Sequence, residues 1–380
     1  MITSQKHLFD IPDDVSYLAC AAMSPLLKTV RHAGSGGLDR KFHPWDFERD
    51  ILEDESENLR LLFARLIGAQ TEDIAIVPSA SYGVATAATN LRVGAGRNIV
   101  ILQDQFPSNV YSWLRLAGEY SGRVVVVARP PDWDWTTAVL AKITPQTDVV
   151  SLPPCHWLDG SALDLARIGR RCREIGAAFV VDATQAVGAM AIDLADWQPD
   201  YLMCSGYKWL MCPYSISFLY VAPHRQNDQP LEIHGQNRGF GSTPDGGIDY
   251  FTGYMAGARR FDMGERTNFI NLPMAVAGLE QVNAWGSDNI QQTLTPLTQR
   301  VAREACDRGW SCPDDAHRVG HIIGITPPFA ITDQMVADLE SAGVYVTRRG
   351  SGLRIAPHVY NNLEDINRLY QTIDRLWISG

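Results

Sequence analysis

The segment AFVVDATQ (residues 178–185) joins a continuous apolar run to an aspartate and a polar turn. An apolar run without alternation is typical of a parallel strand that is buried on both faces. In an open parallel sheet, ligands bind outside the carboxyl ends of the strands. We therefore expect Asp182 to lie at a ligand-binding edge, although for the aspartate taken alone an N-cap of a following helix is the stronger interpretation.

The segment CSGYKW (residues 204–209) follows the same plan, because a short apolar strand ends in a Ser-Gly turn and then a lysine. Lys208 is flanked by Tyr207, Trp209 and further apolar residues, which is unusual company for a solvated charge. Desolvation lowers the pKa of an amine, as an imine-forming lysine requires. A lysine considered by itself is more often a surface residue whose stem covers apolar groups.

The combination of Asp182 and Lys208 changes this balance. Pyridoxal phosphate (PLP) requires a lysine for its aldehyde and a carboxylate that keeps its pyridine nitrogen protonated, so that the ring can accept electrons. Two successive strand ends supply these two groups. The sequence therefore predicts a PLP enzyme in which Lys208 holds the cofactor as a Schiff base.

Short β-branched runs alternate with helical patterns through the first two thirds of the chain. This alternation predicts an α/β fold with a mostly parallel sheet. The expected strands are Ile74–Pro78, Asn98–Leu102, Arg123–Ala128, Asp148–Leu152, Ala178–Asp182, Tyr201–Cys204 and Ser215–Val221. The expected helices between them are Tyr82–Leu91, Val110–Ser121, Trp135–Ile143 and Leu163–Ile175.

The pattern changes near Gly264, and a chain of 380 residues exceeds what one core usually serves. We expect a large PLP-binding domain over residues 14–262. We expect a small C-terminal domain over residues 263–380, which also includes residues 1–13. Its helices are expected at Leu272–Trp285, Ile290–Arg308, Asp333–Ala342 and Leu363–Leu376, and its strands at His321–Thr326, Tyr345–Arg348 and Arg354–Ala356. The polar segment His224–Tyr250 predicts a long loop, of a size that is more often functional than idle.

Composition excludes several classes of protein. A net charge of −10 without a basic run argues against nucleic-acid and anionic-membrane binding. The seven cysteines have irregular spacing and no C-x-x-C pair, which indicates a reduced cytoplasmic protein without a disulfide framework or a metal site. Residues 1–13 lack an apolar signal core, and we expect no membrane span.

Two motifs carry a resemblance to a known family. DATQAVG (182–188) followed by SGYKW (205–209) resembles the class V aminotransferase group of fold-type I PLP enzymes. That group includes cysteine desulfurases, kynureninases, isopenicillin-epimerase-like proteins and sulfoxide lyases. The resemblance extends from YLACAAMSP (17–25) to RIAPHVYN (354–361), and it implies a homodimer with a shared active site.

The resemblance implies which residues contact the phosphate and the ring of PLP. Ala80 and Ser81 follow a strand and open a helix, whose N-terminus favours a phosphate, although a plain capped helix explains the motif equally well. Phe106 in QFPSN (105–109) is similar to the stacking aromatic of kynureninases, with core packing as its alternative. Ser205 and Tyr207 precede the lysine, and their hydroxyls are expected to reach the phosphate.

Further positions follow from the same resemblance. Gln185 is the better candidate for the phenolic oxygen of PLP, and His156 is a second candidate, for which a buried, satisfied histidine is the alternative. Thr267 lies where family members reach the partner subunit's phosphate site. Arg354 matches the arginine that grips the substrate carboxylate, and its planar two-pronged donor suits that group.

The reaction is less closely defined. Lys208 is the natural base for the Cα proton. Desulfurases need a cysteine shortly before the carboxylate arginine, whereas residues 347–352 read TRRGSG, and Cys306 and Cys312 come too early. This argues against a persulfide-forming desulfurase. Arg348 and Arg349 either bind a second acidic group of the substrate or are solvated.

We favour an aminotransferase-like reaction on a small amino acid. The alternative is a PLP-dependent lyase that cleaves a Cβ–S or Cβ–C bond, as cysteine-sulfoxide lyases or kynureninases do. A non-catalytic PLP-fold binding protein is a third class, which the joint presence of Lys208, Asp182 and Arg354 disfavours.

Overall fold

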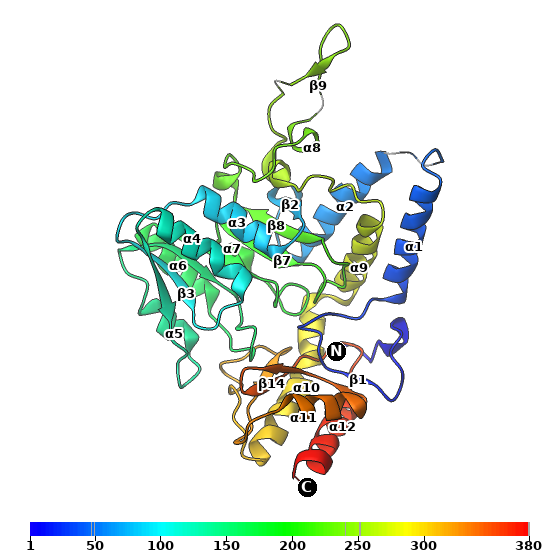
Figure 1. Cartoon of the computed structure of the whole chain (residues 1–380), viewed down its shortest axis with the longest axis vertical. Coiled ribbons are helices and arrows are strands. Elements are labelled where there is room, and N and C mark those ends of the chain that lie inside the picture. Colours follow the sequence, from blue (N-terminus) through cyan, green and yellow to red (C-terminus); the bar gives the residue numbers. More distant parts are fainter. Residues whose placement is uncertain (47, 49, 240, 251, 379–380) are drawn as a thin grey trace.

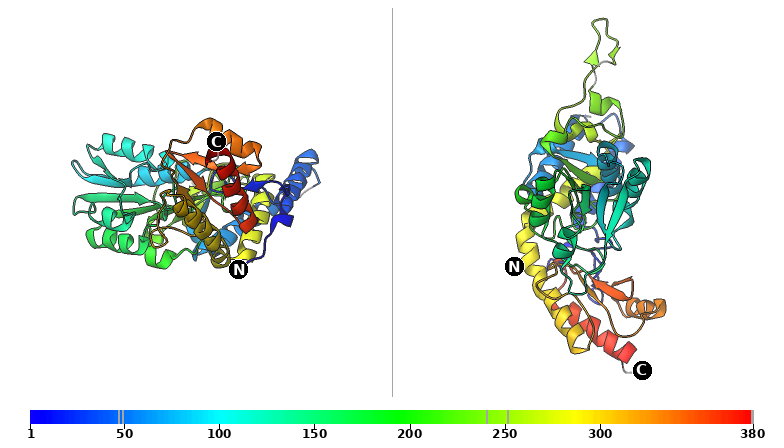
Figure 2. Two further views of the ribbon diagram at one scale, coloured as in Figure 1. Left: turned by 90° about the horizontal axis from the view of Figure 1, so that it is seen from below. Right: turned by 90° about the vertical axis from the view of Figure 1, so that its left-hand side faces the viewer.

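The computed structural model describes residues 1–46, 48, 50–239, 241–250 and 252–378. It contains a large lobe around a central sheet and a smaller lobe formed mainly by residues 287–373 (Figures 1 and 2). The α/β architecture that the sequence predicts is confirmed.

The central sheet has seven strands in the order β2-β8-β7-β6-β5-β3-β4. Neighbouring strands are parallel except at β8, which runs antiparallel to both β2 and β7. All seven predicted strands are present, and their ends differ from the predictions by at most two residues. The strands are β2 (Ile74–Val77), β3 (Asn98–Leu102), β4 (Arg123–Val127), β5 (Thr147–Leu152), β6 (Ala178–Asp182), β7 (Tyr201–Ser205) and β8 (Ser217–Val221).

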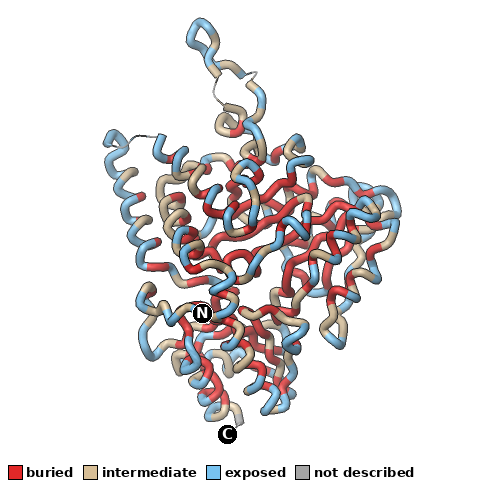
Figure 3. The backbone as a smooth tube through the Cα atoms, turned by 180° about the vertical axis from the view of Figure 1, so that it is seen from behind, coloured by how far each residue is buried: buried red, intermediate tan, exposed pale blue. Residues whose placement is uncertain are grey.

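Alternate residues of these strands face two different cores. Figure 3 shows most of the sheet in the buried colour, whereas strand β4 at its edge is only partly buried. In β6, Phe179 and Val181 face one core, whereas Val180 faces the other. One core is covered by α3 (Ala80–Asn90) and α4 (Tyr111–Glu119). The other is covered by α2 (Asp50–Ile67), α5 (Trp135–Leu140), α6 (Leu165–Ile175), α7 (Leu194–Trp197) and α9 (Asn271–Trp285). The absence of alternation in the sequence follows from this burial on both faces.

Helix α1 (Lys28–Phe42) packs against α9, and the sequence analysis expected no helix there. Glycines make the contact: a Cβ on Gly37 would lie 2.4 Å from the carbonyl oxygen of Phe269, and one on Gly34 would lie 2.8 Å from the sulfur of Met274. Two helices approach this closely only where side chains are absent.

The small lobe contains the three-stranded antiparallel sheet β11-β14-β13. The N-terminal segment packs with it, because β1 (Ser16–Tyr17) pairs in parallel with β12 and Ala19 pairs with Ala356. Residues 1–13 were expected to accompany the small domain, and the pairings of residues 16–19 show that the N-terminal contact with the small lobe continues past them. The elements of this lobe are α10 (Ser287–Asp307), β11 (Ile323–Ile325), α11 (Asp333–Ser341), β12 (Val344–Tyr345), β13 (Thr347–Arg349), β14 (Gly352–Ile355) and α12 (Leu363–Ile373).

The segment expected as a long loop contains short elements, and its antiparallel hairpin projects at the top of Figure 1. Phe240 and Phe251 lie outside the described residues. No helix in the described part of the chain is long and apolar enough to cross a membrane. The remaining elements are α8 (Gly235–Arg238), β9 (Gly241–Ser242), β10 (Ile248–Asp249), the 3₁₀ helices Lys6–Leu8, Thr71–Asp73, Pro107–Asn109, Pro223–Arg225 and Gly257–Phe261, and a π-helix at Asp374–Ile378.

A buried ion pair joins α2 to the sheet and to the chain that leads into α9. Arg60 and Asp262 are 0% and 1% exposed, and their Nη2 and Oδ2 atoms lie 2.5 Å apart. Arg60 also donates to the carbonyl of Ile74, and Asp262 accepts from the backbone N–H of Ile76. Removing one partner leaves an uncompensated buried charge.

We predict that Asp262→Ala lowers the free energy of unfolding by about 3–5 kcal/mol, because buried Arg60 and Arg266 both lose their buried counter-charge and Arg60 keeps only the partly exposed Glu57. The midpoint of urea unfolding measures this loss. Glu119→Gln is the control, since it breaks the exposed Arg115–Glu119 pair and should cost less than about 1 kcal/mol. Equal midpoints for the two variants would contradict the prediction.

Candidate active site

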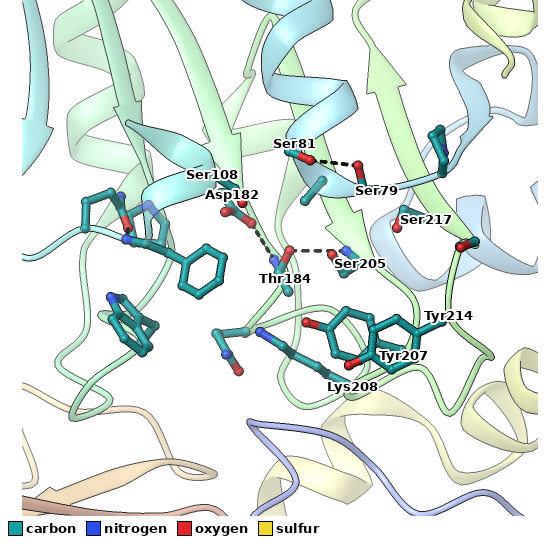
Figure 4. A pocket seen from close by; sticks show the side chains of 18 of the residues that line it. Ser79, Ser81, Ser108, Asp182, Thr184, Ser205, Tyr207, Lys208, Tyr214 and Ser217 are labelled. Carbon is teal, nitrogen blue, oxygen red and sulfur yellow. Dashed lines mark hydrogen bonds between the residues drawn. The ribbon is translucent and has the colours of Figure 1, made fainter. Parts of the chain in front are cut away.

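A cavity of about 340 Å³ lies where strands of the central sheet end at their carboxyl side. Asp182 is the last residue of β6 and Ser205 is the last residue of β7, and both line it. Figure 4 shows polar side chains from neighbouring strand ends gathered around this space. Of the predicted site residues, those that line the cavity are Ala80, Ser81, Phe106, Asp182, Gln185, Ser205, Tyr207 and Lys208.

Lys208 is the only buried lysine among the five in the chain, and 6% of its surface is exposed. Its Nζ lies 5.3 Å from the ring centroid of Phe106 and 5.5 Å from that of Tyr207. Burial lowers the pKa of Lys208 to about 8, while the charge of Asp182 acts in the opposite direction. A much larger fraction of this amine is therefore in the neutral, nucleophilic form near neutral pH than for a solvated lysine.

Asp182 is buried, and its Oδ1 accepts a hydrogen bond of 3.1 Å from the backbone N–H of Thr184. Across the part of the chain that the structure describes, no cation lies within ion-pair distance of this carboxylate. Burial raises the pKa of Asp182, against the effects of Thr184 and Lys208. A buried carboxylate without a cationic partner suits a ligand that brings a positive charge to it, as a protonated pyridine nitrogen does.

Thr184 ties two strand ends together, because its Oγ1 accepts a hydrogen bond of 3.1 Å from the backbone N–H of Ser205 (Figure 4). The turn after β6, which carries Asp182, is thereby fixed to the end of β7, which leads to Lys208. Thr184 is not among the site residues predicted from the sequence. Its position two residues after Asp182, in the turn at the end of β6, is the one feature of the sequence that could have indicated its role.

The N-terminus of α3 forms another part of the cavity wall. Ser79 caps this helix by accepting from the backbone N–H of Tyr82 at 3.1 Å, and its Oγ lies 2.8 Å from that of Ser81. Ser205 and Ser217 add hydroxyls to the same lining. Free backbone N–H groups, the helix dipole and several hydroxyls together fit a phosphate group.

Gln185 lines the cavity and is held at both ends of its amide. Its Oε1 accepts from Nε1 of Trp209 at 2.8 Å, and its Nε2 donates to the carbonyl of Ala21 at 3.0 Å. An amide nitrogen has two N–H groups, so a second donor remains for the phenolic oxygen of PLP.

The structure does not bring His156 and Thr267 into the cavity lining. The ring nitrogens of His156 lie within hydrogen-bond distance of the Gln103 carbonyl and the Leu158 N–H, and its ring stacks on Trp135 at 5.3 Å. His156 is thus a buried histidine with satisfied ring nitrogens. Thr267 accepts a hydrogen bond from Gln236 outside the cavity.

Arg354 lies on β14 beside the cavity and is 1% exposed. Its Nε donates to Thr347 Oγ1 at 3.2 Å and its Nη1 donates to the Trp157 carbonyl at 2.9 Å. Its Nη2 is buried without a partner among the described residues. Trp157 lines the cavity, and its ring centroid lies 5.9 Å from the guanidinium carbon of Arg354.

These groups fit PLP. Lys208 matches the aldehyde, Asp182 the pyridine nitrogen, the start of α3 the phosphate, and Phe106 offers an aromatic face. Among the described residues, no cluster of histidine, cysteine and carboxylate side chains would hold a metal ion.

Comparisons with known proteins agree with this geometry. The family model "Aminotransferase class-V" matches residues 49–369. An uncharacterized aminotransferase of Bacillus subtilis is 26% identical over 97% of this chain and 96% of its own. The isopenicillin N epimerase of Streptomyces clavuligerus is 26% identical over 82% of each chain.

A solved structure shares the fold. The cystine C–S lyase C-DES, solved with its product cysteine persulfide, superposes with a TM-score of 0.86 at 18% identity, over 95% of this chain and 98% of its own.

The shifted pKa of Lys208 predicts how the protein stripped of cofactor takes up PLP. The rate of uptake should rise with pH and level off above about 8, because only the neutral amine reacts. Asp182→Asn should move this inflection to lower pH, since the carboxylate raises the pKa of Lys208. Visible absorbance after mixing measures the rate. Asp196→Asn, at an exposed position on α7, is the control, and an inflection that Asp182→Asn leaves unchanged would refute the assignment.

Proposed function

This chain belongs to the aminotransferase class-V family of PLP-dependent enzymes, and we propose that it catalyses an aminotransferase-like reaction on a small amino acid. The observation that carries the proposal is the burial of Lys208 and Asp182 in one cavity without an ion pair between them. This arrangement supports covalent attachment of the cofactor through Lys208 and control of the charge on its pyridine nitrogen by Asp182.

The proposed roles follow from the position of each group. When bound, PLP draws electrons from the substrate's Cα and makes its C–H bond acidic. Lys208 would hold the cofactor and would also be the group that takes the Cα proton, and its pKa of about 8 suits a base near neutral pH. Asp182 keeps a proton on the pyridine nitrogen. Phe106 covers the ring and excludes water, and Arg354 holds the substrate carboxylate.

Persulfide transfer has little support in this chain. A sulfur-accepting cysteine must be accessible and readily ionised. Residues 347–352 contain no cysteine. Cys20 and Cys155 are fully buried, and burial raises the pKa of both thiols, that of Cys20 to about 12. Such thiols remain protonated and inaccessible.

A PLP-dependent lyase that cleaves a Cβ–S or Cβ–C bond is the second candidate. Tyr207 lines the cavity and stacks on Tyr214 with ring centroids 4.2 Å apart. Burial raises the pKa of Tyr207, so its hydroxyl stays protonated and can donate a hydrogen bond to a leaving group. This observation favours a lyase of the kind found among cysteine-sulfoxide lyases and kynureninases.

We also propose a homodimer in the cytoplasm, with residues 14–262 as the PLP-binding domain. Thr267 lies outside the cavity of its own chain, which leaves it available to a partner subunit's phosphate site. Size-exclusion chromatography coupled to light scattering tests the dimer.

Absorption spectroscopy tests the proposed function. The purified protein should show the visible band of lysine-bound PLP, which Lys208→Ala removes and Lys142→Ala, at an exposed lysine, retains. A panel of amino acids and cysteine derivatives then separates the two candidates. Bleaching that a keto acid reverses identifies an aminotransferase. A persistent band with release of pyruvate and ammonia identifies a lyase that cleaves a Cβ–S bond, and a persistent band with release of alanine identifies one that cleaves a Cβ–C bond. No band, even with added PLP, would refute both.

Replacing Arg354 tests the carboxylate contact. Arg354→Gln should raise KM for the amino acid by about 10- to 100-fold, because a charge-assisted hydrogen bond is lost. The PLP spectrum should not change, and Arg354→Lys should recover part of the loss because a single point charge replaces the planar fork. Steady-state kinetics measure both. An unchanged KM would show that the carboxylate binds elsewhere.

A further inference from the structure

Two neighbouring arginines of β13 have different surroundings. Arg348 is exposed, and its Nη1 lies 2.7 Å from Oδ1 of Asp333. Arg349 is half-buried, and its guanidinium carbon lies 5.4 Å from the ring centroid of Trp157. Successive strand residues point to opposite sides, so Arg348 faces solvent while Arg349 faces the cavity wall.

Trp157 is a fixed part of that wall. Its Nε1 donates to the Asp104 carbonyl at 2.7 Å, and its ring meets Phe106 edge-on with centroids 5.3 Å apart. The guanidinium groups of Arg349 and Arg354 both contact this indole. Two cations therefore lie against one aromatic ring at the edge of the proposed substrate site.

Neither cation has an acidic partner in the part of the chain that the structure describes. No carboxylate within the described residues lies within ion-pair distance of Arg349 or Arg354. Arg349 Nε and Arg354 Nη2 are buried without a hydrogen-bond partner there. Burial lowers the pKa of both groups, and the charge of Arg349 adds to the shift that brings Arg354 to about 9. Lys208 lies close enough for Arg349 to lower its pKa as well.

Burying like charges together is unfavourable unless a ligand neutralises them. The α-carboxylate of an amino acid satisfies one guanidinium. The second would remain without a counter-ion, so the arrangement suits a ligand with two anionic groups. Room exists on the Arg349 side, where a second cavity of about 260 Å³ is lined by Arg349, Ser351 and Thr326. The same cavity is also lined by Asp104 and by the Arg129–Asp159 ion pair, in which the charge of Asp159 is already matched.

We propose that Arg349 is a specificity-determining residue that binds a second acidic group, so that the substrate is an amino acid with an anionic side chain. Arg354 binds the α-carboxylate and Arg349 binds the side-chain anion, and both guanidinium groups lie against the Trp157 ring. The inference rests on the proposed function, because it takes the cavity as the site of an amino-acid substrate.

Carboxylic acids without an amino group test whether Arg349 binds a second acidic group, because they can bind in the site but cannot react. Calorimetric titration of the PLP-loaded protein compares glutarate and succinate with pentanoate and butyrate. The dicarboxylates should bind at least about tenfold more tightly than the monocarboxylates of equal length, because one charge-assisted pair is added. Arg349→Gln should abolish this preference and leave butyrate affinity unchanged. Arg348→Gln, the control at the neighbouring exposed arginine, should retain it.

The possible failures can be told apart. Equal affinities for the two kinds of acid in the unmodified protein would overturn the inference, even if Arg349→Gln does not fold. The inference would also be overturned if Arg349→Gln and Arg348→Gln weakened the preference for dicarboxylates to the same extent. In both cases a retained PLP band would leave the proposed function intact. A protein that never binds PLP would instead refute the proposed function. Melting temperature and the PLP spectrum of each variant confirm that its fold is retained.

Discussion

Desolvation of two opposite ionisable groups without direct pairing is the constraint on which this structure depends. Lys208 and Asp182 are 6% and 7% exposed, yet no ion pair joins them. Burying such groups costs free energy. The two large apolar cores on either side of the sheet offset that cost, and Trp209, Leu210 and Met211 hold the lysine in the interior. The result is a reactive amine and a carboxylate that awaits a cation.

The substrate end of the site is built where the two lobes meet. Trp157 comes from the large lobe, and its backbone carbonyl accepts from Arg354 of the small lobe. The N-terminal segment contributes as well, since the Ala21 carbonyl accepts from Gln185. Cofactor groups therefore come from strand ends of one lobe, whereas the proposed carboxylate contacts come from the other. A small shift between the lobes would alter substrate affinity more than cofactor affinity.

Much of the large lobe could be predicted from the sequence because its strands are buried on both faces. A continuous apolar run such as Phe179–Val181 contrasts strongly with its flanking turns. Helix α1 gave no such signal, since Gly34 and Gly37 make its contact with α9. Apolar periodicity does not detect a helix that packs through the absence of side chains.

In the candidate site, too, some residues could be predicted from the sequence and others could not. Asp182 and Lys208 were identifiable because their chemistry is specific to one cofactor and both follow strands. His156 also follows a strand, but the chain turns after β5 and directs its ring to Gln103 and Trp135, which the residue order does not reveal. The difference between Arg348 and Arg349 was likewise hidden, because it depends on which side of β13 each residue occupies and on the position of Trp157.

The central claim is that burial selects Lys208, among five lysines, as the residue that holds PLP. Borohydride reduction of the PLP-loaded protein, followed by peptide mass mapping, tests it directly because reduction makes the attachment permanent. Our account predicts a pyridoxyl group on the peptide that contains Lys208 and on no other lysine peptide. Stoichiometric label on Lys6, Lys28, Lys41 or Lys142, or no label on the Lys208 peptide, would contradict it.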